Sequence, residues 1–278
     1  MKTKDVRLLD ELERTLRQGG LRLVYQPKVD AVDGSLVRVE ALVRWAHSEL
    51  GAIPPARFVP LAEQHGLIDD LTQWALRTAL RQWRDWKAAG LDTSVAVNIS
   101  AISLEQLDFP DLVERLCRAL SVPTDRLVLE LTEGATQPLI NMMDTLTRFR
   151  IKGVGLALDD FGTGYSGLMQ LRRLPFSEIK IDRQFVTELT TSRDDQVIVR
   201  SVIELAHGLG LKVTAEGVET AEQLSLLRAL GCDLIQGYLL AHPLEADELV
   251  AWASRHKRRW KLLTRPSDEK HERQRIGA

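Results

Sequence analysis

Apolar and polar positions along the chain predict helices that alternate with strands. The opening residues carry leucines at near-helical spacing up to Gly19-Gly20, and two strands over residues 21–29 and 36–45 follow, joined by an Asp33-Gly34 turn. Six further strands then alternate with helices, and their expected ranges are residues 94–100, 126–132, 154–160, 178–182, 211–217 and 233–238. This alternation predicts a parallel sheet, and eight strands without a linker favour a closed barrel.

The composition narrows the class of protein. The chain has 278 residues, of which 44% are hydrophobic and 27% charged, as in an ordinary globular protein. The formal net charge of −2 excludes a protein that binds nucleic acid polymers through bulk positive charge. Residues 251–278 carry a net charge of +6, so residues 1–250 carry −8, and the position of this acidic excess becomes the question.

Cysteine content and hydropathy predict the compartment. Cys117 and Cys232 lie far apart and outside any CxxC spacing, which favours two buried free thiols in a reducing cytosol. The N-terminal residues lack the apolar core of a signal peptide, and the sequence has no run of 18 apolar residues. We therefore expect a soluble cytoplasmic chain without a membrane segment.

Polar residues interrupt the strands at one recurring position. Buried parallel strands are usually apolar throughout. Here every strand from the second to the eighth carries a polar residue at or near its C-terminal end: Glu40, Asn98, Glu130, Asp159 with Asp160, Lys180, Glu216 and Gln236. In a barrel these ends meet at one mouth, which is where barrel enzymes have their active sites.

The chemistry of this set points to divalent cations. Five carboxylates in one pocket would repel each other unless cations lay between them. Their position in this pocket also indicates where the acidic excess of residues 1–250 lies. Oxygen ligands without His or Cys clusters favour Mg²⁺ or Mn²⁺ over Zn²⁺. The adjacent Asp159 and Asp160 suit a two-metal site of the kind that hydrolyses phosphate esters, with Lys180 beside the attacking water or the phosphate.

Seven motifs in order carry a family resemblance. They are EALVRW, the NIS of VAVNIS, ELTE, DDFGTGYSG, KID, EGVE and QGY. Together they resemble the EAL domain, a family of bacterial cyclic di-GMP phosphodiesterases, over about residues 9–252. The resemblance implies an α/β fold, a modified TIM (β/α)₈ barrel with one antiparallel strand near the start, which accounts for the initial hairpin. We expect the EAL domain to occupy residues 1–260, followed by a polar basic tail over residues 261–278.

The resemblance also implies roles for individual residues. One metal would be held by Glu40, Asn98, Glu130 and Asp159, and a second by Asp159, Asp160 and Glu216. Lys180 matches the lysine that contacts the nucleophilic water, Gln236 a glutamine of the same site, and Glu133 the residue that holds the loop after the fifth barrel strand. Gln26, Leu42 and Arg44 match substrate contacts.

The implied activity is hydrolysis of cyclic di-GMP to linear pGpG by a water that two Mg²⁺ or Mn²⁺ ions activate, in a homodimer. A non-catalytic cyclic di-GMP receptor and a metal enzyme on the same barrel with a non-nucleotide substrate are the alternatives, although every expected metal position is present. The sequence GTGYSG imitates a dinucleotide-binding loop, but that interpretation leaves Glu40, Glu130 and Glu216 unexplained. Gly167, where serine is usual in the family, bears on the order of this loop.

Two expectations concern residues away from the pocket. Trp74, Trp83 and Trp86 lie on one predicted helix and are expected to pack against the outside of the barrel. The basic run at residues 256–261, which includes Trp260, is expected to form a solvated helix end, and a surface that attracts anionic lipid or nucleic acid is the alternative.

Overall fold

The computed structural model describes residues 3–47, 49–132, 142–162 and 171–264. These residues form one nine-stranded sheet with the strand order β1-β9-β8-β7-β6-β5-β4-β2-β3. The strands are β1 Leu21–Asp30, β2 Leu36–His47, β3 Gly51–Ile53, β4 Ser94–Asn98, β5 Leu127–Thr132, β6 Gly155–Phe161, β7 Glu178–Ile181, β8 Lys212–Ala215 and β9 Leu234–Gln236. Because β1 also pairs with β2, eight of the strands close into a barrel.

The first strand runs against its neighbours. β1 is antiparallel to β2 on one side and to β9 on the other, whereas the pairs from β2–β4 through to β8–β9 are parallel. The short turn between β1 and β2 requires this direction, because a parallel pair needs a crossover of a dozen or more residues. The predicted barrel with one antiparallel strand near the start is confirmed.

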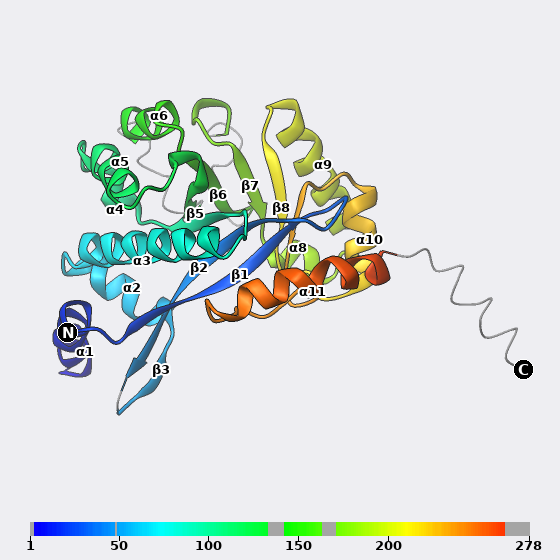
Figure 1. The fold of residues 1–278 in the computed structure, drawn as a ribbon. Coiled ribbons are helices and arrows are strands. Elements are labelled where there is room, and N and C mark those ends of the chain that lie inside the picture. The colour runs from blue at the N-terminus through cyan, green and yellow to red at the C-terminus, as the bar shows by residue number, and fades with distance from the viewer. Residues whose placement is uncertain (1–2, 48, 133–141, 163–170, 265–278) are drawn as a thin grey trace, which may run out of the picture.

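The additional strand β3 was not predicted. It pairs with β2 through Trp45↔Ile53 and His47↔Gly51, beyond the part of β2 that pairs with β4. Figure 1 shows this hairpin projecting away from the barrel beside the N-terminal helix. Its strand has three residues, too few to produce a readable alternation in the sequence.

Helices surround the barrel (Figure 1). Before β4 they are α1 Thr3–Gln18, α2 Pro55–Gln64 and α3 Ile68–Ala88. Between β4 and β7 they are α4 Ala101–Leu104, α5 Phe109–Ala119, the 3₁₀ turn η1 Thr124–Arg126 and α6 Met143–Ile151. After β7 come α8 Arg183–Thr187, α9 Arg193–Gly208, α10 Ala221–Ala229 and α11 Glu248–Leu263. Residues 133–141, which precede α6, lie outside the described residues.

The apolar core lies mainly between the strands and the helices. On α3, Trp83 and Trp86 are buried in this core and Trp74 packs against it, as expected for the outside of the barrel. Inside the barrel, Ala96, Val128 and Ala157 form a separate cluster of small side chains. Such small residues on three neighbouring strands leave the remaining interior volume to the polar side chains of the other strands.

The last helix corrects one expectation. The side chains of Lys257, Arg258 and Arg259 are exposed, but His256 and Trp260 are only 3% exposed. The imidazole of His256 stacks on Trp252 with ring centroids 4.5 Å apart. A solvated helix end is therefore wrong for these two residues, because the helix turns them toward the barrel while its basic residues face outward. Residues 265–278, most of the expected tail, lie outside the described residues.

The features used to predict the compartment have structural counterparts. Cys117 and Cys232 are both free and buried, as expected. Burial raises the pKa of the Cys117 thiol to about 11 and that of Cys232 to about 12, so both remain protonated at neutral pH. No helix within the described ranges combines the length and the apolar character that crossing a membrane requires.

Candidate active site

Most of the predicted polar residues meet at one mouth of the barrel. The pocket there has a volume of about 310 Å³. The predicted residues that line it are Gln26, Glu40, Leu42, Asp159, Asp160, Lys180, Glu216 and Gln236. They come from β1, β2, β6, β7, β9 and the residue that follows β8, so strands far apart in the sequence contribute to one site.

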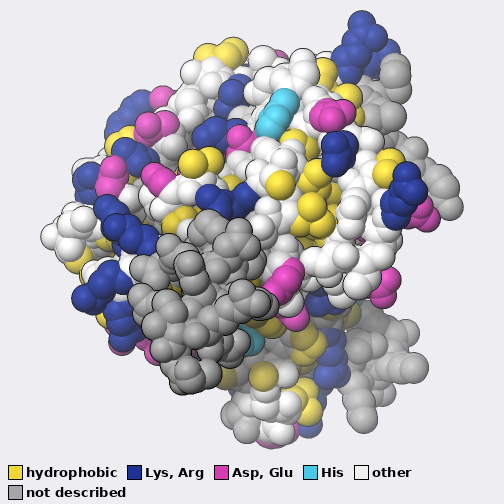
Figure 2. Space-filling model, turned by 90° about the vertical axis from the view of Figure 1, so that its right-hand side faces the viewer, with side chains coloured by type: hydrophobic (Ala, Val, Ile, Leu, Met, Phe, Trp, Pro, Cys, Tyr) yellow, Lys and Arg dark blue, Asp and Glu magenta, His cyan; other side chains and the backbone are white. Residues whose placement is uncertain are grey.

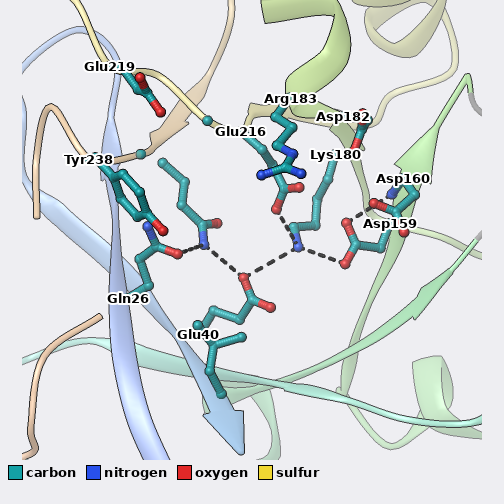
Figure 3. A pocket seen from close by; sticks show the side chains of 14 residues that line it. Gln26, Glu40, Asp159, Asp160, Lys180, Asp182, Arg183, Glu216, Glu219 and Tyr238 are labelled. Atoms are coloured by element: carbon teal, nitrogen blue, oxygen red, sulfur yellow. Dashed lines mark hydrogen bonds and ion pairs between the residues drawn. The ribbon is translucent and has the colours of Figure 1, made fainter. Parts of the chain in front are cut away.

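The ammonium group of Lys180 lies at the centre of the acidic side chains. Its Nζ atom is 2.6 Å from Glu216 Oε1, 2.9 Å from Asp159 Oδ2 and 3.5 Å from Glu40 Oε2. Figure 3 shows these three carboxylates directed toward the ammonium from different sides. A fourth, Glu130, lies deeper, with Oε2 at 2.9 Å from the same nitrogen. One positive charge is thus shared by four carboxylates.

Side-chain amides fix the orientation of Glu40. Asn98 donates from Nδ2 to Glu40 Oε1 at 2.8 Å, and Gln236 donates from Nε2 to Glu40 Oε2 at 2.8 Å. Gln236 Nε2 also donates to Gln26 Oε1 at 3.1 Å. The buried carbonyl oxygen of Gln236 has no hydrogen-bond partner within the described chain. This oxygen could accept a hydrogen bond from a water that coordinates a cation at the site.

An irregularity at the end of β6 directs both adjacent aspartates to the mouth. In a regular strand, consecutive side chains point to opposite faces of the sheet. Here the register between β6 and β7 shifts between Leu158 and Phe161, and Asp160 has φ +56°. The Asp160 backbone N–H donates to Asp159 Oδ1 at 2.9 Å. The bulge therefore changes the direction of Asp160, a use of bulges that is common beside active sites.

The carboxylates form two groups that share one member. Glu40, Glu130 and Asp159 offer ligand oxygens that all lie within 4.8 Å of one another, and so do Asp159, Asp160 and Glu216. Asn98 lies beside the first group through its bond to Glu40. Oxygen donors in this number fit hard divalent cations, which prefer carboxylate and carbonyl ligands. The residues present therefore fit the two cations that the sequence predicts.

Burial and charge act in opposite directions on these acids. Burial raises the pKa of Glu216 to about 8 and that of Asp159 to about 6, and Lys180 offsets this increase only in part. Burial also acts on Glu130, but Lys180 and Lys28 outweigh it and lower its pKa to about 2. Burial lowers the pKa of Lys180, yet its carboxylate neighbours outweigh burial and hold it well above the ordinary value. Further positive charge would be needed to ionise Glu216 at neutral pH.

A second polar layer lies beneath the mouth, and the sequence analysis missed it. Its members are Lys28, Arg38, Glu178 and Thr214. Each lies two residues before a predicted site residue or, for Lys28, two residues after Gln26. Because side chains two apart in a strand share a face, the alternation contained a signal for all four.

Residues at the rim were also missed. Asp182, Arg183, Glu219 and Tyr238 line the pocket (Figure 3). Asp182 and Glu219 stand inside the KID and EGVE motifs, so the motifs themselves were the available signal. Asp182 and Arg183 follow β7, and Glu219 follows β8. The folding of these segments decides that their side chains reach the pocket.

The predicted substrate contacts divide between two pockets. Gln26 and Leu42 line the acidic pocket, whereas Arg44 lines a neighbouring pocket of about 350 Å³ that Leu42 also borders. The Arg44 guanidinium donates to the Val43 carbonyl oxygen at 2.9 Å, and burial together with Arg22 lowers its pKa. Glu133, the residue expected to hold the loop after the fifth barrel strand, and Gly167 lie outside the described residues.

The acidic excess thus has a location inside the molecule. Figure 2 shows Lys, Arg, Asp and Glu side chains scattered together over one face of the surface. By contrast, Glu40, Glu130, Asp159, Asp160 and Glu216 gather within the two groups at the mouth.

Known protein families and relatives share the sequence of this chain. The profile of the EAL domain family matches residues 9–243. A bifunctional diguanylate cyclase/cyclic di-GMP phosphodiesterase, MucR of Pseudomonas aeruginosa, is 43% identical over 250 residues, which are 89% of this chain and 36% of MucR. The cyclic di-GMP phosphodiesterase NbdA of the same organism is 43% identical over 87% of this chain and 31% of NbdA. This chain therefore spans about a third of the length of these relatives.

Solved structures share the fold. A complex of the PaMucR phosphodiesterase with c-di-GMP is similar at a TM-score of 0.82 and 43% identity, covering 87% of this chain and 99% of that one. The EAL enzyme Bd1971, in a form that binds cAMP and cyclic di-GMP, is similar at a TM-score of 0.85 and 28% identity, over 90% of this chain and 69% of that one.

Proposed function

The chain belongs to the EAL domain family, and from this premise we propose that it is a metal-dependent phosphodiesterase that hydrolyses cyclic di-GMP to linear pGpG. The observation that supports this most is the pair of acidic groups joined through Asp159 around the Lys180 ammonium. Phosphodiester hydrolysis needs an activated water and compensation of negative charge, and two adjacent cation sites provide for both.

Two divalent cations, Mg²⁺ or Mn²⁺, are the proposed cofactors. Glu40, Asn98, Glu130 and Asp159 would hold one, and Asp159, Asp160 and Glu216 the other. When bound, such cations lower the pKa of a coordinated water and neutralise charge on phosphoryl oxygens. The roughly 4.8 Å limit on the separation of the ligand oxygens within each group supports this assignment.

The chain's own residues would position the reaction. Lys180 is held among the carboxylates by several ion pairs, which place its positive charge at the mouth, where it would stabilise negative charge that develops on a phosphoryl oxygen. The Gln236 carbonyl oxygen accepts no hydrogen bond from the described residues, and it can orient a water. Gln26, Leu42 and Arg44 are proposed substrate contacts, and Glu133 is proposed to hold the loop after the fifth barrel strand.

The organisation of the chain is proposed as well. We assign residues 1–260 to the EAL domain and residues 261–278 to a polar basic tail, in a homodimer located in the cytoplasm. The matched residues make up 36% of MucR and 31% of NbdA. Regulation by further domains is therefore a separate question from the chemistry of the barrel.

The decisive experiment separates products after incubation with cyclic di-GMP. We expect linear pGpG in the presence of Mg²⁺ or Mn²⁺ and no product with EDTA. Tight binding of cyclic di-GMP without product would instead support the receptor alternative. Metal-dependent hydrolysis of other phosphate esters, with cyclic di-GMP left intact, would support a metal enzyme with another substrate.

Two substitutions test the assigned ligands. Glu40→Gln and Asp159→Asn each replace a ligand oxygen by a neutral amide of similar shape, and we expect turnover to fall more than about 100-fold with little change in far-UV circular dichroism. Glu204→Gln is the matched control, because Glu204 is exposed on the outer helix α9. Turnover close to that of the wild type in either test variant would contradict the mechanism.

A further inference from the structure

Lys28 is a fully buried lysine that the proposed chemistry does not use. It lies on β1, the antiparallel strand, and its side chain is 0% exposed. A lysine is almost never completely buried unless it is paired, because removing its charge from water has a large cost. Its partners therefore indicate why it is retained inside the barrel.

The nearest partner of Lys28 is a proposed metal ligand. Lys28 Nζ is 2.5 Å from Glu130 Oε1, while Lys180 Nζ is 2.9 Å from Glu130 Oε2. Each oxygen of this carboxylate thus faces one ammonium group. The Glu130 side chain is itself 0% exposed, so the two ammonium groups compensate a charge that bulk water does not solvate.

The second carboxylate near Lys28 is already satisfied by other groups. Glu178 Oε1 lies 4.0 Å from Lys28 Nζ, beyond hydrogen-bond distance. Glu178 instead accepts a hydrogen bond from Thr214 Oγ1 at 2.6 Å and forms an ion pair with Arg38. The short contact of Lys28 is consequently directed to Glu130.

The register shows why Glu178 is present. Lys28 lies directly opposite Arg38 on β2, and two like charges in that relation destabilise a strand pair. Glu178 on β7 lies near both the Lys28 ammonium and the Arg38 guanidinium, and its negative charge compensates their repulsion. Positive and negative charges therefore alternate from Arg38 through Glu178, Lys28 and Glu130 to Lys180.

We propose that Lys28 is a positioning residue of the metal site: its ammonium holds Glu130 Oε1, which fixes the carboxylate in the orientation that turns Oε2 to the mouth. This inference rests on the proposed metal-dependent function. Groups that hydrogen-bond a metal ligand from behind orient it, and their loss typically weakens metal binding about 10–100-fold.

The test measures Mn²⁺ affinity directly, by titration of the purified protein followed through the electron paramagnetic resonance of free Mn²⁺. For Lys28→Met we expect the Kd for Mn²⁺ to rise about 10–100-fold. Because a lone Lys28→Met leaves an excess buried carboxylate, Lys28→Met with Glu178→Gln removes one charge of each sign and keeps the fold testable. We expect the same rise in the double variant, and a change within about threefold for Glu178→Gln alone.

The matched control is Lys152→Met. Lys152, the residue that follows α6, also bridges two carboxylates, Asp111 at 2.9 Å and Glu114 at 2.6 Å, but these lie on the outer helix α5. We expect its Mn²⁺ affinity to equal that of the wild type. In turnover assays, the Mn²⁺ concentration for half-maximal rate should rise in the Lys28 variants, with kcat at saturating Mn²⁺ lowered less than about fivefold.

The outcomes are distinguishable. A folded double variant whose Kd for Mn²⁺ matches that of Glu178→Gln overturns the role of Lys28 and leaves the proposed function intact. A wild-type protein that neither binds Mn²⁺ nor hydrolyses cyclic di-GMP overturns both.

Discussion

Gly237 shows how a single residue limits what the site can tolerate. It separates Gln236 from Tyr238 at the pocket, in the motif QGY. A Cβ atom there would lie 2.1 Å from the Val218 carbonyl oxygen and 2.3 Å from the Val218 nitrogen. Both atoms belong to the backbone, and Val218 N also donates to the Gln236 carbonyl oxygen at 3.1 Å. The two chain segments can therefore approach only because residue 237 has no side chain.

Gly237→Ala is expected to lower the free energy of unfolding by at least about 3 kcal/mol, because backbone atoms must move to admit the methyl group. Urea denaturation of the purified variant measures this change. Gly208→Ala is the control, since its new methyl group would meet nothing within 4 Å at the end of α9, and it should be neutral or slightly stabilising. Equal stability of Gly237→Ala and the wild type would contradict the packing.

At the scale of elements, α11 covers the turn between β1 and β2. A Cβ atom on Gly34, whose φ is +71°, would lie 2.2 Å from Trp260 Cγ, so the turn rests directly on the tryptophan ring. One helical turn earlier, His256 is buried and its imidazole stacks on Trp252 with ring centroids 4.5 Å apart. An imidazole in such surroundings is stable only in its neutral form.

The stability of this contact should depend on pH. Burial, with a smaller effect from Arg259, lowers the pKa of His256 from 6.5 to about 4. Between these values the unfolded chain binds more protons, so the contribution of His256 to stability is complete above pH 6.5 and falls as the pH drops to 4. The loss approaches about 3 kcal/mol at pH 4 and below.

Replacement of the imidazole isolates this effect from the titration of carboxylates elsewhere. His256→Phe keeps an aromatic ring beside Trp252 and removes the titrating group. Urea denaturation at pH 6.5 and pH 4 should show a larger loss of stability in the wild type than in this variant. Parallel losses in the two proteins would refute the assignment.

At the scale of the whole molecule, closure of the barrel concentrates acids that the chain keeps apart. Glu40 and Glu216 are 176 positions apart in sequence, yet both contact Lys180 Nζ. Four carboxylates around one ammonium repel each other, and cations that bind only this closed arrangement would stabilise it.

Mn²⁺ should therefore raise the melting temperature of the protein relative to EDTA. At a free concentration about 100 times the Kd, the native state gains about 2.7 kcal/mol, which corresponds to roughly 5–10 °C for a domain of this size. Differential scanning fluorimetry measures the shift. Asp159→Asn alters the ligand shared by both groups and should show a much smaller shift; an unchanged shift would exclude Asp159 as a ligand.

The sequence by itself determined the barrel, its antiparallel first strand and most of the polar set at its mouth. It could do so because strand periodicity, and the position of a polar residue at the C-terminal end of a strand, are visible within each segment of sequence alone. Neither requires knowledge of which strands are neighbours in the sheet. The division of these acids into two groups was implied by the resemblance to the EAL domain and not by their placement. Lys28 and Glu178 were readable in principle, because they share a strand face with Gln26 and Lys180.

Only the tertiary structure decided the remaining features. The bulge that directs Asp160 to the mouth depends on pairing with β7, and the burial of His256 and Trp260 depends on contact with a turn more than 220 positions away. Which ammonium faces which oxygen of Glu130 depends on the order and register of the strands. Such contacts are set by closure of the sheet, and no local pattern of hydrophobic and polar residues encodes them.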